Sequence, residues 1–275
     1  MNLSDVEAME AHGGNDRPVA LALLLVSLLA SLFWAGLVLG GLVLAGAAPQ
    51  AGDASLDAVA STTAGAGALV RHPTLAWKAA QLALVFLTWA GLCTALMLPL
   101  ASRAAVLFAR LAGCRAARRA RLRTGLFVLG YLGAWTGFAL LAAIAQWMLH
   151  PSGPAGAVRH PLLLGLVLVA AGVYQWTPAK HACLAHCRAP LGGILAGWRD
   201  GLLGALGRGA EHARQCLGCC WLLMLLLLAT GPDNPAAIAV VGLLVLAEIR
   251  LAAGHWIASA GGLVLLAVGT GLLFP

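Results

Sequence analysis

Long apolar stretches separated by polar connections dominate the hydrophobic pattern of this chain. They cover residues 19–48, 76–100, 125–149, 161–177, 216–230, 235–249 and 255–274. A helix needs about 20 predominantly apolar residues to cross a bilayer, although about 17 can suffice. The pattern therefore predicts an all-α, polytopic transmembrane bundle with about seven spans, and six is the alternative count because the stretches at 216–230 and 235–249 are short.

A different pattern occupies residues 190–209, between the fourth and fifth stretches. Apolar side chains recur there at helical spacing and charged residues lie among them. The apolar set is Leu191, Ile194, Leu195, Trp198, Leu202, Leu203 and Leu206. This spacing predicts a cytoplasmic amphipathic helix on the inner surface of the membrane.

Composition supports a membrane protein. The chain is 61% hydrophobic and only 10% charged, with a mean hydropathy of +0.90, which excludes a soluble domain of this length. Residues 1–18 are polar and acidic and lack the basic segment of a signal peptide. We expect residues 1–18 to form a cytoplasmic tail and residues 19–275 to form the integral membrane domain.

Basic residues predict the orientation. Fourteen of the 17 Lys and Arg residues fall on one side of the predicted bundle, mostly in the connections at 103–123 and 180–214. The positive-inside rule places that side and the N-terminus in the cytoplasm of a bacterial inner membrane. The net charge of +7 is then explained by contact with anionic lipid, and no nucleic-acid partner is expected.

Five of the seven cysteines lie in two short clusters at the edges of apolar stretches. In the first, Cys183 and Cys187 are four residues apart, so a helix would place both thiols on one face. His186 lies between them and is a candidate ligand that joins or replaces one of the thiols. Thiolates bind Cu(I), Zn(II) and iron–sulfur clusters, so this cluster predicts a metal site.

The second cluster begins the stretch at 216–230. Cys216 and Cys219 form a C-x-x-C motif, and Cys220 follows directly. Cys216, Cys220 and Met224 are spaced by four residues and share a helical face, which predicts a ladder of sulfur atoms entering the membrane. Thiolate followed by thioether suits Cu(I).

Several alternatives remain open at this point. Zn(II) would favour a closed tetrahedral set, for which Cys183, Cys187, Cys216 and Cys219 are available. The C-x-x-C pair is also compatible with a membrane thiol oxidoreductase, and the bundle with a metal transporter. Histidines that precede prolines at positions 72, 150 and 160 are helix-capping residues or an external ligand set.

We assign structural roles to three residues outside the clusters, namely Cys93, Cys114 and Glu248. Cys93 and Cys114 are interpreted as small apolar packing residues. Glu248 lies within an apolar stretch, where an ionisable group needs a partner. Arg250 or Lys180 is the expected partner.

The chain resembles a family of bacterial integral membrane proteins that are predicted to bind metal. The resemblance rests on the segments Trp89–Pro99, 174–190 and 216–224, and on Tyr131, Trp135 and Gln146. That family includes copper chaperones of polyphenol oxidase (tyrosinase) systems. The similarity covers about residues 76–250.

The resemblance implies copper binding at the membrane and delivery to a cuproenzyme client. It extends to the five clustered cysteines, to Met97 and to His212. The resulting prediction is a protein that is not an enzyme and holds copper, as Cu(I), with Cys183, Cys187, Cys216, Cys219, Cys220, His186, His212 and Met224 as candidate ligands. The sequence does not indicate an oligomeric state.

Overall fold

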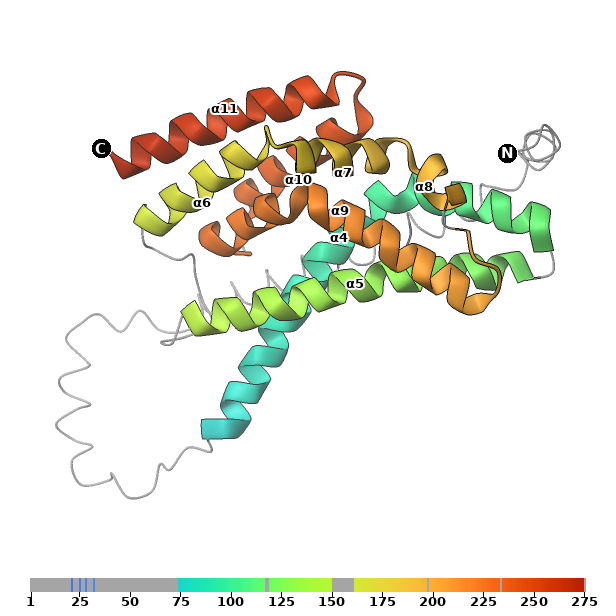
Figure 1. Cartoon of the computed structure of the whole chain (residues 1–275). Helices are drawn as coiled ribbons and strands as arrows, with labels where there is room; N and C mark the ends of the chain where they lie inside the picture. The colour runs from blue at the N-terminus through green and yellow to red at the C-terminus, as the bar shows by residue number, and fades with distance from the viewer. Residues whose placement is uncertain are drawn as a thin grey trace.

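The computed structural model describes residues 74–116, 119–149, 161–196, 198–232 and 234–274, together with positions 21, 25, 28 and 32. The described residues contain no β-strand, which confirms the all-α class for this part of the chain. Their helices are α4 (Thr74–Ala116), α5 (Ala120–Leu149), α6 (Pro161–Tyr174), α7 (Pro178–Arg188), α8 (Pro190–Ala196), α9 (Leu202–Thr230), α10 (Pro235–Arg250) and α11 (Gly254–Leu273) (Figure 1). The predicted tail, most of the predicted first span and the histidines at 72, 150 and 160 lie outside the described residues.

Four of these helices are long and apolar enough to cross a membrane: α4, α5, α9 and α11. A fifth span results if α6 and α7 are counted together, because they form a pair bent by 69°. Helix α10 has 16 residues, which corresponds to about 24 Å of helix. That length falls short of the roughly 30 Å hydrocarbon core. The count of seven stays a prediction, because the predicted first span lies mostly outside the described residues.

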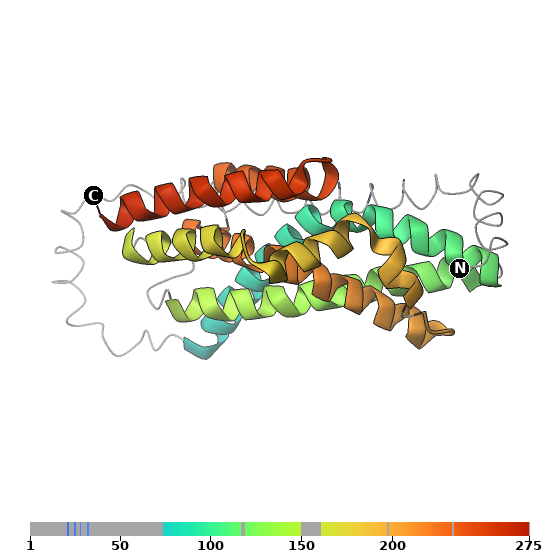
Figure 2. The same cartoon turned by 45° about the horizontal axis from the view of Figure 1, so that its top comes forward.

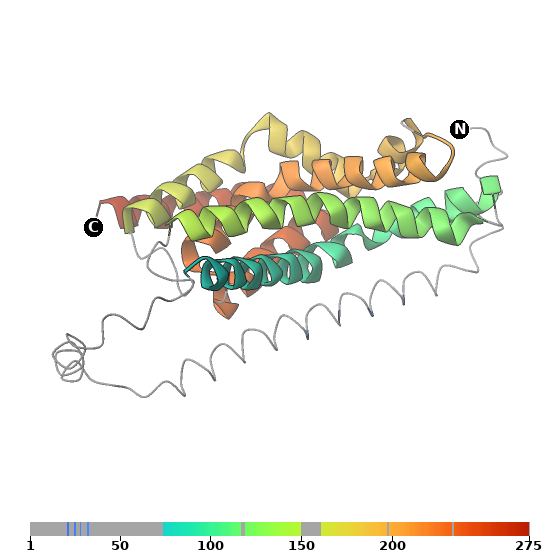
Figure 3. The same cartoon turned by 90° about the horizontal axis from the view of Figure 1, so that it is seen from below.

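Helices α5 and α9 run side by side along the molecule (Figures 1 and 3). Two glycines allow this approach. A Cβ atom at Gly130 would lie 2.1 Å from the carbonyl oxygen of Leu206, and one at Gly209 would lie 1.8 Å from that of Phe127. Small residues let helix backbones approach closely in membrane proteins, so the two glycines set the distance between α5 and α9.

Helix α11 packs along α6 in a similar way (Figure 2). A Cβ atom at Gly172 would lie 2.8 Å from the carbonyl oxygen of Gly262, and one at Gly269 would lie 2.9 Å from the side chain of Leu168. The glycines are spaced by seven residues on each helix, at 165 and 172 and at 262 and 269, which places each pair on one face.

The predicted amphipathic helix over residues 190–209 is not a single helix. Helix α8 ends at Ala196, and Leu202 begins α9, which continues without interruption through the cysteines. Gly201 separates the two with a φ of 96°, a conformation that glycine adopts at little cost. The apolar face is also not reserved for lipid, because Ile194 and Ala205 are buried in a core formed with α4 and α5.

The two basic connections meet at one end of the molecule. Arg123, at the start of α5, lies 4.0 Å from the carboxylate of Asp200 in the link between α8 and α9. Trp198 in the same link stacks on Phe108 of α4, with ring centroids 5.3 Å apart. This end also carries α8 and the last turn of α7.

Candidate metal centre

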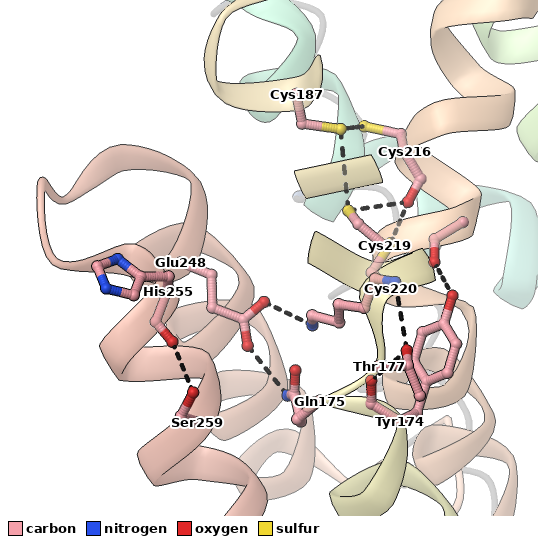
Figure 4. Close-up of polar contacts among 12 residues, drawn as sticks. Tyr174, Gln175, Thr177, Cys187, Cys216, Cys219, Cys220, Glu248, His255 and Ser259 are labelled. Atoms are coloured by element: carbon pink, nitrogen blue, oxygen red, sulfur yellow. Dashed lines mark hydrogen bonds and ion pairs between the residues drawn. The ribbon is translucent and has the colours of Figure 1, made fainter. Parts of the chain in front are cut away.

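Three cysteine sulfurs from two helices converge in the interior of the bundle (Figure 4). The sulfur of Cys187, on α7, lies 3.6 Å from that of Cys216 and 3.8 Å from that of Cys219, both on α9. All three residues are buried. We call Cys187, Cys216 and Cys219 the sulfur group.

The bend between α6 and α7 brings Cys187 to this position. Pro178 begins α7, and the side chain of Thr177 caps the helix by accepting a hydrogen bond from the backbone N–H of Lys180. Proline at the first helical position and threonine at the N-cap both favour a helix start at this point. Cys187 then falls in the last turn of the 11-residue helix, opposite α9.

Contacts on α9 complete the approach of the two helices. A Cβ atom at Gly218 would lie 2.5 Å from the sulfur of Cys183, so this glycine lets α7 lie directly on α9. The hydroxyl of Tyr174, at the end of α6, donates to the carbonyl oxygen of Gly218. The C-x-x-C spacing places Cys216 and Cys219 on adjacent turns of the same face.

The thiols of Cys219 and Cys220 both donate to the carbonyl oxygen of Cys216, at 3.1 and 3.0 Å. The side chains of these two neighbours also interact with each other. Met224 is buried one turn beyond Cys220 in the same hydrophobic core. Cys220 and Met224 therefore extend the sulfur group along α9, in the order that the spacing predicts.

The remaining predicted ligands lie around the sulfur group and not within it. Cys183 is half-buried against Gly218 and interacts electrostatically with Cys219. His186 and His212 line a cavity whose walls include none of these cysteines. Cys93 is buried on α4 in the apolar core, as its packing role predicts, whereas the side chain of Cys114 lies outside the described part.

Tyr131 on α5 is a polar neighbour that was not among the predicted ligands. Its hydroxyl lies 3.1 Å from the carbonyl oxygen of Met97 and 3.5 Å from the sulfur of Cys216. A fully buried hydroxyl needs a partner, and this one connects α4 and α5 to the sulfur group. A tyrosine in the middle of an apolar stretch is the sequence signal that indicates such a role.

A buried ion pair lies beside the cysteines. The ammonium of Lys180 is 2.7 Å from the carboxylate of Glu248. This carboxylate also accepts a hydrogen bond of 3.0 Å from Gln175 (Figure 4). Lys180 therefore satisfies Glu248, and Arg250 instead donates to the carbonyl oxygen of Pro99 at 2.6 Å. Lys180 also interacts electrostatically with Cys219 and Cys220, and Glu248 interacts with Cys219, so both charges of the pair lie beside the thiols.

The donor set of the sulfur group fits a soft metal ion. Thiolate–metal bonds of about 2.3 Å in a tetrahedral site place the sulfurs about 3.8 Å apart, close to the 3.6 and 3.8 Å in this chain. Three thiols from two helices match the preference of Cu(I) for sulfur ligands. Among the described residues, however, no group of three His, Cys, Asp or Glu side chains is placed so that it could hold a metal ion.

Comparison with known protein families identifies the chain. The model of the PpoB2 family, described as a copper chaperone, matches residues 86–272. The chain belongs to this family. The PpoB2 match contains every cysteine of both clusters and confirms the resemblance inferred from the sequence.

Two residues on which that resemblance rests are also in contact in the structure. The indole N–H of Trp89 donates to the side-chain oxygen of Gln146 at 2.6 Å, which joins α4 to α5 within the matched region. Comparison with curated proteins and with solved structures gives no match.

Proposed function

We propose that this member of the PpoB2 family is a non-enzymatic inner-membrane protein that holds Cu(I) at Cys187, Cys216 and Cys219 and delivers it to a cuproenzyme. The observation that carries the proposal is that the buried sulfur of Cys187 on α7 lies within 3.8 Å of the buried sulfurs of both Cys216 and Cys219 on α9. Membership of a copper-chaperone family supports copper as the cargo. A client of the polyphenol oxidase type is proposed from the resemblance of the sequence.

Binding proceeds by replacement of thiol protons. Each cysteine that takes up the ion releases its proton and binds as thiolate, so two or three thiolates around one Cu(I) leave a net negative charge. Lys180 lies beside the thiols as one half of the neutral ion pair with Glu248, so it offsets this charge only in part. We propose that Cys183, which lies against Gly218 at the edge of the group, exchanges with the buried thiols as the ion enters or leaves.

The charge distribution supports a cytoplasmic location for the site. Most of the Lys and Arg residues lie in the connections at 103–123 and 180–214, and the positive-inside rule assigns such connections to the cytoplasm. We propose that the N-terminus shares this side and that anionic lipids contact the basic residues. Thiols remain reduced in the cytoplasm, as Cu(I) binding requires.

Measurement of bound copper tests the proposal. Protein purified under reducing conditions is expected to retain copper in proportion to protein, and Cys216→Ser combined with Cys219→Ser is expected to lower the ratio at least about tenfold. Elemental analysis of the purified proteins gives the ratio directly. Cys93→Ala is the matched control, because it removes a buried thiol outside the sulfur group and should leave the copper content unchanged.

Two results would contradict the proposal. If the double serine variant retains as much copper as the wild type, the sulfur group does not hold the ion. If a single Cys216→Ser or Cys219→Ser variant instead accumulates a stable mixed disulfide with a thiol substrate, the C-x-x-C motif serves thiol–disulfide exchange.

A further inference from the structure

A cavity of about 280 Å³ lies at the basic end of the molecule, and two of its lining residues, His186 and His212, precede Cys187 and Cys216 by one and four residues. Its walls come from α7, α8 and α9, and its polar lining consists of His186, Arg208, Glu211, His212 and Gln215. The volume lies at the lower end of ordinary ligand pockets. It is sufficient for an ion with a small carrier molecule.

His212 lies between this cavity and the sulfur group. On α9 it precedes Cys216 by four residues, so it lies about 6 Å before that cysteine along the helix axis on the same face. Its ring packs 5.8 Å from the ring of Tyr131, whose hydroxyl contacts the sulfur of Cys216. His212 also interacts electrostatically with Cys219. It thus adds an imidazole to the ladder formed by Cys216, Cys220 and Met224.

His186 lines the same cavity from α7 and directly precedes Cys187 of the sulfur group. Its Nδ1 atom lies 2.9 Å from the carbonyl oxygen of Ala182. A carbonyl oxygen only accepts hydrogen bonds, so in the neutral ring Nδ1 carries the proton and Nε2 keeps its lone pair. A backbone carbonyl that fixes the tautomer in this way is typical of histidines that bind metal ions.

The other charged groups of the cavity are already engaged. Arg208 donates to the carbonyl oxygen of Gly193 at 2.9 Å. Both carboxylate oxygens of Glu211 accept hydrogen bonds from Arg214, and one also accepts from Gln215. The two imidazoles are therefore the cavity groups best suited to bind an incoming ion.

We propose that His186 and His212 form a receiving site that binds Cu(I) from a cytoplasmic carrier and passes it to the sulfur group. The inference rests on the proposed function. In the transfer, each Cu–N bond breaks as a Cu–S bond forms, the copper stays Cu(I), and the displaced thiol proton leaves through the cavity. Thiolates are softer ligands than imidazoles, so the exchange runs from the histidines towards the cysteines.

The rate of copper uptake tests the receiving site. The reduced wild-type protein is mixed with the Cu(I)–bicinchoninate complex, and the loss of its absorbance is followed by stopped flow. His186→Ala combined with His212→Ala should slow uptake by at least about tenfold and leave the final amount of bound copper unchanged. His181→Ala on α7 and His255→Ala on α11 are the matched controls and should load at the wild-type rate.

The single variant His186→Ala distinguishes loss of the receiving site from loss of the fold. The side chain of His186 is exposed, so its removal should leave the packing intact, whereas His212 packs on Phe127 and Tyr131. The single variant should also slow uptake without lowering the final copper content. Wild-type rates in both histidine variants would overturn the receiving site. A lower final content at an unchanged rate would overturn it as well, because the histidines would then belong to the holding site.

A second measurement separates this inference from the proposed function. In a Cys187→Ser, Cys216→Ser, Cys219→Ser variant, X-ray absorption of protein given equimolar Cu(I) should show nitrogen ligands, and His186→Ala combined with His212→Ala in that background should remove them. Nitrogen coordination that survives the removal of both histidines would overturn the receiving site. If the wild-type protein takes up no copper, the proposed function fails first. If it loads at a rate that does not depend on the histidines, only the receiving site fails.

Discussion

At the scale of single residues, the ion pair of Lys180 with Glu248 has the largest energetic consequence. Both side chains are almost fully buried, at 1% exposure each, and Gln175 hydrogen-bonds the same carboxylate. Removal of water from two charges costs several kcal/mol per ion, and the cost is recovered only while the partners remain together. The pair therefore constrains how α6, α7 and α10 pack beside the thiols.

Lys180→Met is expected to lower the free energy of unfolding by roughly 3–5 kcal/mol, because Glu248 would remain buried without a counter-charge. Adding Glu248→Gln should restore most of this loss, since the amide oxygen can still accept from Gln175. Thermal unfolding of the detergent-solubilised variants measures both effects. Glu211→Gln is the control, because it breaks an exposed pair with Arg214 and should cost less than about 1 kcal/mol. Equal stability of Lys180→Met and the wild type would contradict the argument.

At the scale of helices, the site depends on how closely α9 approaches α5 and α7. The close approach to α5 passes through Gly130 and Gly209, and the approach to α7 passes through Gly218. The lengths and apolar character of these helices follow from the hydrophobic pattern, but their spacing does not. A glycine that faces a neighbouring backbone and a glycine that faces open space are identical in the sequence.

Gly130→Ala is expected to destabilise the protein by about 1–3 kcal/mol or more, because its methyl group would overlap the carbonyl of Leu206. The displacement of α5 should also move Tyr131 away from Cys216 and reduce copper retention. Gly133→Ala is the matched control on the same helix, since a Cβ atom there meets nothing within 4 Å. It should be neutral or stabilising by up to about 1 kcal/mol. Thermal unfolding and copper content of the two variants provide the comparison, and equal effects would contradict it.

At the scale of the whole molecule, the basic connections that follow α4 and α7 meet at one end, where Arg123 lies 4.0 Å from Asp200. The cavity that contains His186 and His212 opens among the helices of that end. If the positive-inside rule holds for this chain, copper carriers of the cytoplasm have direct access to the cavity. The orientation is therefore part of the proposed mechanism.

Labelling of an introduced thiol tests this orientation. Arg199 is exposed in the link between α8 and α9, so Arg199→Cys should react with a membrane-impermeant maleimide in inverted membrane vesicles and not in spheroplasts. The wild-type chain, whose sulfur group is buried, provides the background. Reaction of Arg199→Cys in spheroplasts alone would place the basic end outside and contradict the proposed source of copper.

Local features of the site were predictable from the sequence because they depend on helical periodicity. The spacing of Cys216, Cys220 and Met224 assigns them to one face of a helix wherever that helix lies, and the clustered cysteines already indicated a soft metal. The apolar stretches likewise predicted the all-α class. Residues 190–209 were interpreted wrongly as one helix, because their apolar spacing does not show that Gly201 turns the chain or that Ile194 is buried against α4 and α5.

Long-range packing decided the rest. The sequence alone predicts that Cys183 and Cys187 share a face of a helix. The bend of 69° between α6 and α7 and the close contact at Gly218 then determine which of the two meets α9. Cys187 contacts the cysteines of α9, whereas Cys183 remains at the edge of the sulfur group. The same packing selects Lys180 over Arg250 as the partner of Glu248. Periodicity is a property of neighbouring residues, whereas a site shared by two helices depends on the angle and distance at which they cross, and these are set by side chains far apart in the chain.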